Sequence, residues 1–376
     1  MMLKEKYEIL RGEPIGGFVG DSMDIPCIET SDSERLCKHP IVSVHMLAYN
    51  HEAYIRQAIE GVMMQKTDFE FELVIGEDCS QDKTREICFE YQKKYPDKIR
   101  VLWWHENVSK FGGNGRRTFA RCRGEFIAFC EGDDYWIDPE KLSKQVDVFR
   151  RNPSVGLCFT DVKVFFQEDG RFKTDGKDTL FRPGFIDRCD FRNIYLCGEI
   201  KGRDLCVDKS LVRTQTTMYR AELLRKAKCD REIFHWRLFL GDVIQVLGIS
   251  MVADVYYLPD ITAVYRVNAT GVTCGPNRWK VWRDAWLVRL YFSQEHGDRS
   301  IVDLLQRKIF RFRYQRVPWG KSLKMMREEL DLLIAVPEFK SFAHERHLAL
   351  ERCVMGLPLP IWVIRFFLRL KRKIFS

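Results

Sequence analysis

Three acidic residues stand together where a strand is expected to end. Glu131, Asp133 and Asp134 follow the run at residues 125–129. That run is typical of a strand buried on both faces, and the carboxyl end of such a strand is where α/β proteins bind ligands. Like charges this close repel one another, and a hard divalent cation with oxygen ligands would stabilise them. The pattern predicts a metal-binding turn, with an acidic turn that faces water as the alternative.

A further acidic residue, Asp242, has two possible roles. It lies between an apolar run at residues 235–240 and a helical run at residues 243–247. An Asp at such a place is a common N-cap, which stabilises a helix by about 1 kcal/mol. It could also be a general base, but a helix N-terminus lowers the pKa of a carboxyl group, so partial burial would have to offset that effect. The residue pattern leaves both roles open.

Strands alternate with helices through the first half of the chain. Strand-like runs stand at residues 41–47, 71–75, 98–103, 125–129 and 155–166. Asp138 is expected to cap a helix that has Pro139 at its first position. The segment 167–203 is expected to be a long, exposed and irregular loop. The alternation predicts an α/β fold with a doubly wound, mostly parallel sheet.

Loops that follow parallel strands open on one edge of a sheet, so we expect Asn50, Asp78 and Asp133 to share a crevice. Helix N-termini point at the same crevice and favour phosphate groups. Polar groups for a base and a ribose, helix dipoles and carboxylates for a metal together suit a nucleoside diphosphate. The chain has no GxxxxGK[ST] motif and no GxGxxG motif after the first strand, which excludes a P-loop and a dinucleotide fingerprint.

Three motifs, in this order along the chain, resemble a known family. They are "IVSVHMLAYN" at residues 41–50, "GEDCSQD" at residues 76–82 and "FCEGDDYW" at residues 129–136. Together they resemble the nucleotide-sugar-binding half of a family 2 inverting glycosyltransferase with the GT-A fold. The resemblance is close over residues 40–165 and continues more loosely to about residue 275.

The resemblance implies a role for each candidate residue. Asp133 would bind a divalent metal, Mn²⁺ or Mg²⁺, on the donor diphosphate, and Asp242 would be the general base. The expected donor is a UDP-sugar, and the residues expected to contact it are Ala48, Tyr49, Asn50, Glu52, Asp78, Glu131, Gly132 and Arg266. Glu131 stands where the family commonly has Asp, and Arg266 could instead hold the acceptor or form a surface ion pair.

The implied reaction is the transfer of one sugar to a hydroxyl group of a saccharide or lipid-linked saccharide during cell-surface polysaccharide synthesis. The processive QxxRW motif is absent, so one sugar is expected per acceptor visit. Two alternatives remain open. A sugar nucleotidyltransferase would share the sheet, but its glycine-rich, arginine-bearing loop is replaced by "AYNHEAYI". A catalytically silent binding protein would keep Asp78 and Asp133 without needing Asp242.

Composition and apolar patterning divide the chain into three regions. We expect an N-terminal extension at residues 1–39 and a glycosyltransferase domain at residues 40–275, in which residues 40–165 form the donor half and residues 166–275 the acceptor half. Residues 276–376 are expected to be helical. Thirteen cysteines, an odd number without a CxxC pair, favour reduced thiols and a cytoplasmic location.

The chain has a net charge of +8, and its basic residues are most clearly concentrated in the expected last helix. Residues 361–376 place apolar side chains on one helical face and arginines on another, which is typical of a helix at an anionic membrane surface. Packing against the domain is the alternative. No apolar run reaches the roughly 18 residues of a membrane span. The pattern favours peripheral attachment to the inner face of the cell membrane over binding to nucleic acid. His344 and His347 are expected to be solvated rather than metal ligands, because no third ligand is evident.

Overall fold

The computed structural model describes residues 25–111, 113–174, 181–197, 199–200, 203–204, 212–229, 241–268, 288 and 291–292. The chain forms two units, Gly16–Ala285 and a second one of Met1–Ile15 with Trp286–Ser376. Most of the predicted helical region 276–376, including His344, His347 and the basic helix at 361–376, lies outside the described residues. Among the residues that are described, no helix is both long and apolar enough to cross a membrane.

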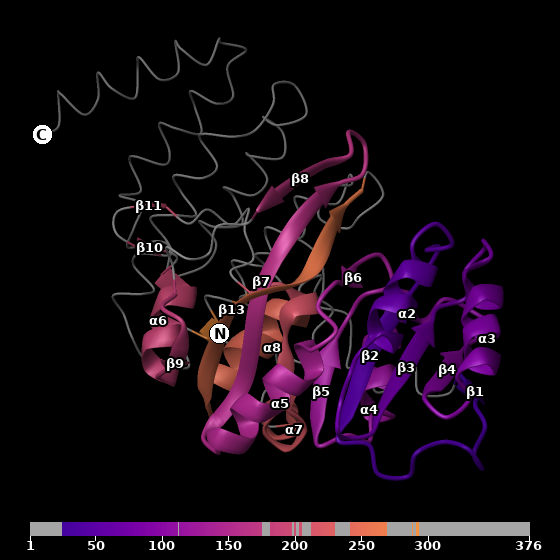
Figure 1. The fold of residues 1–376 in the computed structure, drawn as a ribbon, viewed down its shortest axis with the longest axis horizontal. Coiled ribbons are helices and arrows are strands. Elements are labelled where there is room, and N and C mark those ends of the chain that lie inside the picture. The colour runs from indigo at the N-terminus through magenta and orange to yellow at the C-terminus, as the bar shows by residue number, and fades with distance from the viewer. Residues whose placement is uncertain are drawn as a thin grey trace, which may run out of the picture. The chain divides into compact units, whose positions relative to one another are not determined.

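The first half of the larger unit is a parallel sheet with helical crossovers (Figure 1). Its strands are β2 (Val42–Ala48), β3 (Phe71–Glu77), β4 (Ile99–Trp103) and β5 (Phe126–Phe129). Its helices are α2 (Ile55–Met63), α3 (Thr84–Lys94), α4 (Asn114–Ala120) and the short 3₁₀ helix η1 (Val108–Phe111). Because β2 pairs with β3 on one side and with β5 on the other, the sheet has its topological switch point beside β2. Ligands of such sheets bind outside the carboxyl ends of the strands at this point.

The second half completes a mixed sheet of eleven strands. The order is β1-β4-β3-β2-β5-β12-β7-β13-β6, with β8 beside β7 and β9 beside β13. The added strands are β1 (Ile28–Thr30), β6 (Tyr135–Trp136), β7 (Val155–Phe166), β8 (Arg171–Thr174), β9 (Gly184–Ile186), β12 (Met218–Arg220) and β13 (Asp254–Val267). Two further strands, β10 (Glu199–Ile200) and β11 (Arg203–Asp204), pair with each other in a separate sheet. The remaining helices are α5 (Lys141–Arg151), α6 (Arg188–Cys197), α7 (Ala221–Cys229), α8 (Gly241–Ser250) and η2 (Thr214–Thr216). The long strands β7 and β13 run parallel, side by side (Figure 1).

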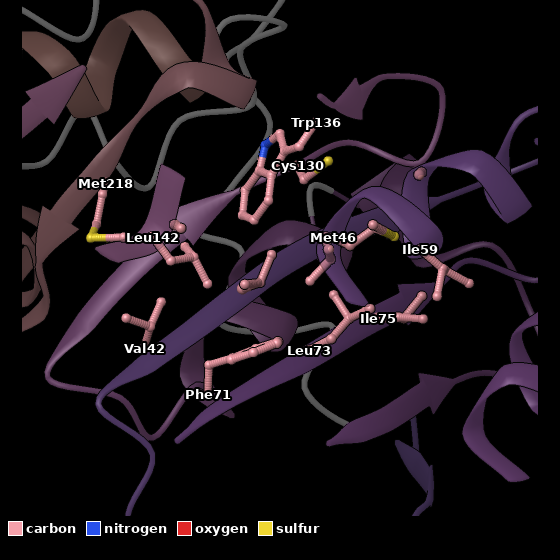
Figure 2. Packing of buried hydrophobic residues seen from close by; sticks show 14 of the residues in the cluster. Val42, Met46, Ile59, Phe71, Leu73, Ile75, Cys130, Trp136, Leu142 and Met218 are labelled. Atoms are coloured by element: carbon pink, nitrogen blue, oxygen red, sulfur yellow. The ribbon is translucent and has the colours of Figure 1, made fainter. Parts of the chain in front are cut away.

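Alternate residues of β2 and β3 face one hydrophobic core. Figure 2 shows Val42 and Met46 of β2 on the same side as Ile59 of α2 and Leu142 of α5. Residues between them in β2 face the opposite layer, where His45 Nε2 lies 3.1 Å from the carbonyl oxygen of Gly115 in α4. Helices therefore cover both faces of the parallel strands, and the strands are buried on both faces as their apolar runs predict.

The amino-terminal edge of these strands is closed by paired charges. Glu72 accepts hydrogen bonds from Arg123 Nη2 at 2.6 Å and from Arg100 Nη1 at 3.2 Å. Arg100 Nε also donates to Glu29 Oε1 at 2.8 Å. Glu29 belongs to β1, which pairs with β4, so part of the segment expected to be a surface extension is a strand of the sheet.

Two local predictions were wrong. The helix expected to begin at Pro139 begins at Lys141, and Asp138 Oδ1 accepts the main-chain N–H of Glu140 at 2.9 Å in a turn before it. Residues 167–203 are not one irregular loop, because β8, β9 and α6 form within them. Phe191 and Tyr195 of α6 are buried, and this packing against distant strands gives the segment its structure.

Candidate functional site

The acidic turn, residues 131–134, is held directly against the carboxyl end of β2. Cys130 donates its main-chain N–H to the carbonyl oxygen of His45 at 3.1 Å, and Gly132 donates to Leu47 at 2.9 Å. A Cβ atom on Gly132 would stand 2.8 Å from both Leu47 O and His51 Nδ1. No side chain fits there without moving the turn or His51, so the glycine allows the turn to lie against β2.

The two aspartates of the acidic turn have different surroundings. Asp134 is 4% exposed, and its Oδ1 accepts the main-chain N–H of Arg266 at 2.7 Å. Burial, followed by the charge of Asp133, raises the pKa of Asp134 well above its usual value. Asp133 is only partly buried, and its Oδ2 lies 3.4 Å from Nδ2 of Asn268. Asp134 is thus a structural acid, and Asp133 is the one that can reach a ligand.

Glu131 connects the acidic turn electrostatically with Asp242. Burial raises the pKa of Glu131 to about 8, and the charges of Asp133 and Asp242 contribute to this rise. Asp242 is therefore near enough for its charge to act on Glu131. Helix α8 spans Gly241–Ser250 in the described residues, and Asp242 lies in its first turn. Asp242 is partly exposed, as a base that meets a substrate must be.

The loops that follow β2 and β3 are tied together through Asn50. Its Oδ1 accepts the main-chain N–H of Gln81 at 2.8 Å, and its own N–H donates to Ser80 Oγ at 3.0 Å. Asn50 has a φ of 55°, in the left-handed region that asparagine tolerates. Tyr49 beside it is 43% exposed, and the carbonyl oxygen of Ala48 accepts the N–H of Asp78 at 3.0 Å.

Glu52 continues this link between the two loops. Its Oε2 accepts the main-chain N–H of Lys83, just before α3, at 2.8 Å. Its own N–H donates to Asp82 Oδ2 at 3.0 Å. The carboxylate of Glu52 therefore satisfies a donor at the start of α3, which is a structural role beside the predicted donor contact.

Asp78 is fully buried and organises the segment that follows β4. Its Oδ1 accepts the N–H of Val108 at 2.7 Å and its Oδ2 that of Ser109 at 3.0 Å. Burial raises the pKa of Asp78, although these hydrogen bonds act in the opposite direction. A carboxylate has about four acceptor positions, so Asp78 could bind a further donor group, but its main observed task is to hold the start of η1.

The sequence analysis missed several residues around the acidic turn. The guanidinium of Arg213 lies 4.4 Å from the ring centre of Tyr265, and its charge acts against the rise in the pKa of Asp134 that burial causes. The sequence analysis assigned no role to Asn268, whose amide contacts Asp133. The signal was available, because Arg266 and Asn268 are two positions apart along an extended segment and so face the same side.

The residues present fit a divalent ion bound mainly by a substrate. Among the described residues no three His, Cys, Asp or Glu side chains form a ligand group. Asp133 nevertheless offers a carboxylate with the amide of Asn268 beside it. Mg²⁺ is commonly held by one or two carboxylates together with substrate phosphates, and Mn²⁺ prefers the same oxygen ligands. Asp133 is therefore the candidate protein ligand, and the amide nitrogen of Asn268 lies beside its carboxylate as a hydrogen-bond donor.

Comparison with known proteins shows similarity to one family of glycosyltransferases. The model of the family "Glycosyl transferase family 2" matches residues 43–217. The putative teichuronic acid biosynthesis glycosyltransferase TuaG of Bacillus subtilis is 33% identical over 260 residues, which are 68% of this chain and 91% of that protein. The uncharacterized protein Rv1520 of Mycobacterium tuberculosis is 31% identical over 68% of this chain, which spans only 64% of that relative.

Solved structures show the same fold. TarS of S. aureus, crystallised with UDP, has a TM-score of 0.57 at 20% identity, covering 84% of this chain and 89% of that one. The complex of TarS with UDP-GlcNAc has a TM-score of 0.56 at 19% identity, with coverage of 84% and 86%. The mixed sheet with its switch point beside β2 is thus a known architecture.

Proposed function

The chain belongs to glycosyl transferase family 2, and we propose that it transfers one sugar from a nucleoside diphosphate sugar to a hydroxyl group of a saccharide acceptor. Family membership and the GT-A fold, both expected from the sequence motifs, are confirmed. The donor, the acceptor and the roles of single residues are part of the proposal.

One observation carries the proposal. The acidic turn lies against the end of β2, and the charge of Asp242 reaches Glu131 within that turn. These observations support a site in which the partly exposed Asp133 and Asp242 lie at one edge of the sheet, where the linked loops after β2 and β3 also open. This is the arrangement that a sugar transfer needs, with a site for the leaving diphosphate near a base for the acceptor.

We take UDP as the nucleotide to test first. The sequence motifs favour it, and TarS, which has the same fold, was crystallised with UDP and with UDP-GlcNAc. Exposed Tyr49 and the main chain near Asn50 would contact the base, and Asp78 and Glu131 would lie near the ribose. Burial, followed by the charges of Asp133 and Asp242, raises the pKa of Glu131 to about 8, and its carboxyl group could form a hydrogen bond with a ribose hydroxyl.

In the proposed mechanism Asp242 accepts the proton of the acceptor hydroxyl as its oxygen attacks the anomeric carbon. The bond to the diphosphate breaks in line with this attack, so a single displacement inverts the anomeric centre. A divalent ion held by Asp133, with Asn268 beside it, would supply positive charge for the leaving diphosphate. Asp134 and Gly132 keep the turn in place, and the first turn of α8 presents Asp242.

The acceptor is proposed to be a saccharide or lipid-linked saccharide used in cell-surface polysaccharide synthesis. TuaG carries teichuronic acid biosynthesis in its name, and its likeness covers most of that protein. A cytoplasmic enzyme attached to the inner face of the membrane through residues 361–376 would meet a lipid-linked acceptor there. Deleting these residues and measuring co-sedimentation with anionic liposomes tests this attachment, and undiminished binding would refute it.

The proposed function is tested by calorimetric titration of UDP, with GDP and dTDP as controls, in the presence and absence of Mn²⁺. We expect UDP to bind in a metal-dependent way and Asp133→Ala to abolish that binding. Asp68→Ala is the matched control, because Asp68 has a 79% exposed side chain just before β3, at the opposite edge of the sheet. Absence of binding for all three nucleotides, with and without metal, would contradict the proposal.

A further inference from the structure

The side chain of Arg266 lies behind the acidic turn and binds its main chain. Its Nε donates to the carbonyl oxygen of Asp133 at 2.8 Å, and its main-chain N–H donates to Asp134 at 2.7 Å. Arg266 is only 7% exposed. One residue of β13 therefore contacts both aspartates of the turn, through a main-chain oxygen of the first and a carboxyl oxygen of the second.

The outer nitrogens of the same guanidinium reach two other segments. Nη2 donates to Gln57 Oε1 in α2 at 2.7 Å, and Nη1 donates to Gln167 Oε1, just after β7, at 3.1 Å. The rings of Tyr54 and Tyr135 have their centres 4.9 Å and 5.0 Å from the guanidinium carbon. Because these partners come from several directions, the guanidinium has one well-defined position.

Each of these hydrogen bonds ends on a protein acceptor. We propose that Arg266 is a positioning residue, which orients the carboxylate of Asp133 toward the crevice and fixes the acidic turn relative to α2. This inference rests on the proposed function, in which Asp133 binds the metal on the donor diphosphate. It replaces the direct contact between Arg266 and the donor that the sequence motifs indicate.

The geometry explains how such an effect reaches the carboxylate. The carbonyl group of Asp133 belongs to the peptide that follows its Cα, so holding this oxygen restricts the direction of the Cα–Cβ bond. Gln57 lies in the first turn of α2, the helix that follows the loop of Tyr49 and Asn50. The guanidinium of Arg266 thus links the acidic turn to the helix that follows the predicted base-binding loop at Tyr49 and Asn50. A lysine cannot replace it, because an ammonium lacks the planar fork that reaches three separate acceptors.

The test compares Arg266→Lys with wild type in Mn²⁺ titrations followed by electron paramagnetic resonance, with UDP present and absent. We expect the Kd for Mn²⁺ to rise by about 10- to 100-fold, the range found when outer-shell partners of a metal are removed. Arg220→Lys is the matched control. Arg220 also lies over aromatic rings, at 5.3 Å from Phe126, and donates to a main-chain carbonyl, that of Phe149 at 3.1 Å.

A second variant avoids any risk to folding. Gln57→Ala removes one acceptor of the guanidinium from an exposed side chain, and we expect a smaller rise in the Kd for Mn²⁺ with an unchanged Tm. A wild-type Mn²⁺ affinity in Arg266→Lys together with weakened UDP binding would overturn the inference and restore Arg266 as a direct donor ligand.

Hydrogen exchange separates failure of this inference from failure of the proposed function. If wild-type protein binds neither UDP nor Mn²⁺, the proposed function fails. The positioning role is then tested by the hydrogen-exchange rates of the main-chain amides of Gly132 and Asp134, which donate hydrogen bonds within and beside the turn. Faster exchange of these amides in Arg266→Lys than in Arg220→Lys supports the positioning role. Equal exchange in the two variants overturns it.

Discussion

Asp134 of the acidic turn accepts the main-chain N–H of Arg266 in β13 over 2.7 Å, although the two residues are far apart in the chain. This hydrogen bond assigns the buried aspartate to structure and leaves its neighbour Asp133 for chemistry. Adjacent acidic residues in one turn therefore have separate tasks, which substitution can distinguish.

We predict that substitutions of Asp134 affect stability, whereas substitution of Asp133 affects UDP binding. Asp134→Asn keeps an oxygen that can accept the N–H of Arg266, so the free energy of unfolding should fall by less than about 1 kcal/mol. Asp134→Ala leaves that N–H without its acceptor and should cost about 1–3 kcal/mol. Asp133→Asn should leave stability nearly unchanged and weaken Mn²⁺-dependent UDP binding at least about tenfold. Urea unfolding and calorimetry measure the two effects, and equal losses of UDP binding at both positions would contradict this division.

Asp242→Asn should stop transfer without affecting donor binding. A general base contributes about 10²- to 10⁴-fold to rate, so kcat for sugar transfer should fall by that factor while the Kd for UDP stays unchanged. Glu222→Gln is the control, because Glu222 is likewise an acidic residue in the first turn of a helix, α7. Unchanged transfer by Asp242→Asn would exclude it as the base, and a silent binding protein would then be the better description.

Asn50 should be sensitive to the loss of its left-handed conformation as well as of its hydrogen bond. Asn50→Gly loses the bond from Gln81 but adopts a φ of 55° freely, so it should cost about 1 kcal/mol of unfolding free energy. Asn50→Ala adds left-handed strain and should cost about 2 kcal/mol in total. Urea unfolding of both variants checks this difference. Equal stability of the two would show that the loop relaxes to another conformation.

The parallel half of the fold could be predicted because its evidence is local. Buried parallel strands are continuous apolar runs, and the runs at 41–47 and 71–75 match β2 and β3 to within about two residues. Strand β8 pairs with the preceding β7 in a hairpin closed by the turn at residues 167–170, a local signal that the sequence analysis overlooked. Strand β9 pairs with the distant β13, and such long-range pairing cannot be read from residues 184–186 alone.

For the candidate site, too, only the local features could be predicted from the sequence. The acidic turn was found because its three acids lie within four consecutive residues. The contact of Asn268 with Asp133 and the protein partners of Arg266 depend on where β13 lies beside the turn, which only the folded sheet determines. The sequence also left the role of Asp242 open, because the segment alone does not show which residues lie near its carboxyl group.

Lys141 gives the clearest pH prediction because it is fully buried behind the site. Its Nζ donates to Gln145 Oε1 at 2.5 Å, lies 3.4 Å from the carbonyl oxygen of Thr216, and stands over the ring of Trp136. Both oxygens are neutral acceptors. Burial lowers the pKa of Lys141 to about 7, while the nearby thiol of Cys158 acts in the opposite direction.

The sign follows from the protons bound in each state. Between about pH 7 and pH 8.5 the unfolded chain keeps this amine protonated while the folded protein loses the proton, so the contribution of Lys141 to stability rises with pH, by up to about 2 kcal/mol over this window. We predict that Lys141→Met abolishes this rise in urea unfolding series. Lys144→Met is the control. Hydrogen bonds to Asp138 and Asp260 raise the pKa of Lys144 above its usual value, so this amine is charged in both the folded and the unfolded state. Substitution of Lys144 should therefore change the stability by the same amount at each pH in this window. A wild-type pH dependence in Lys141→Met would mean that the buried amine does not titrate in this range.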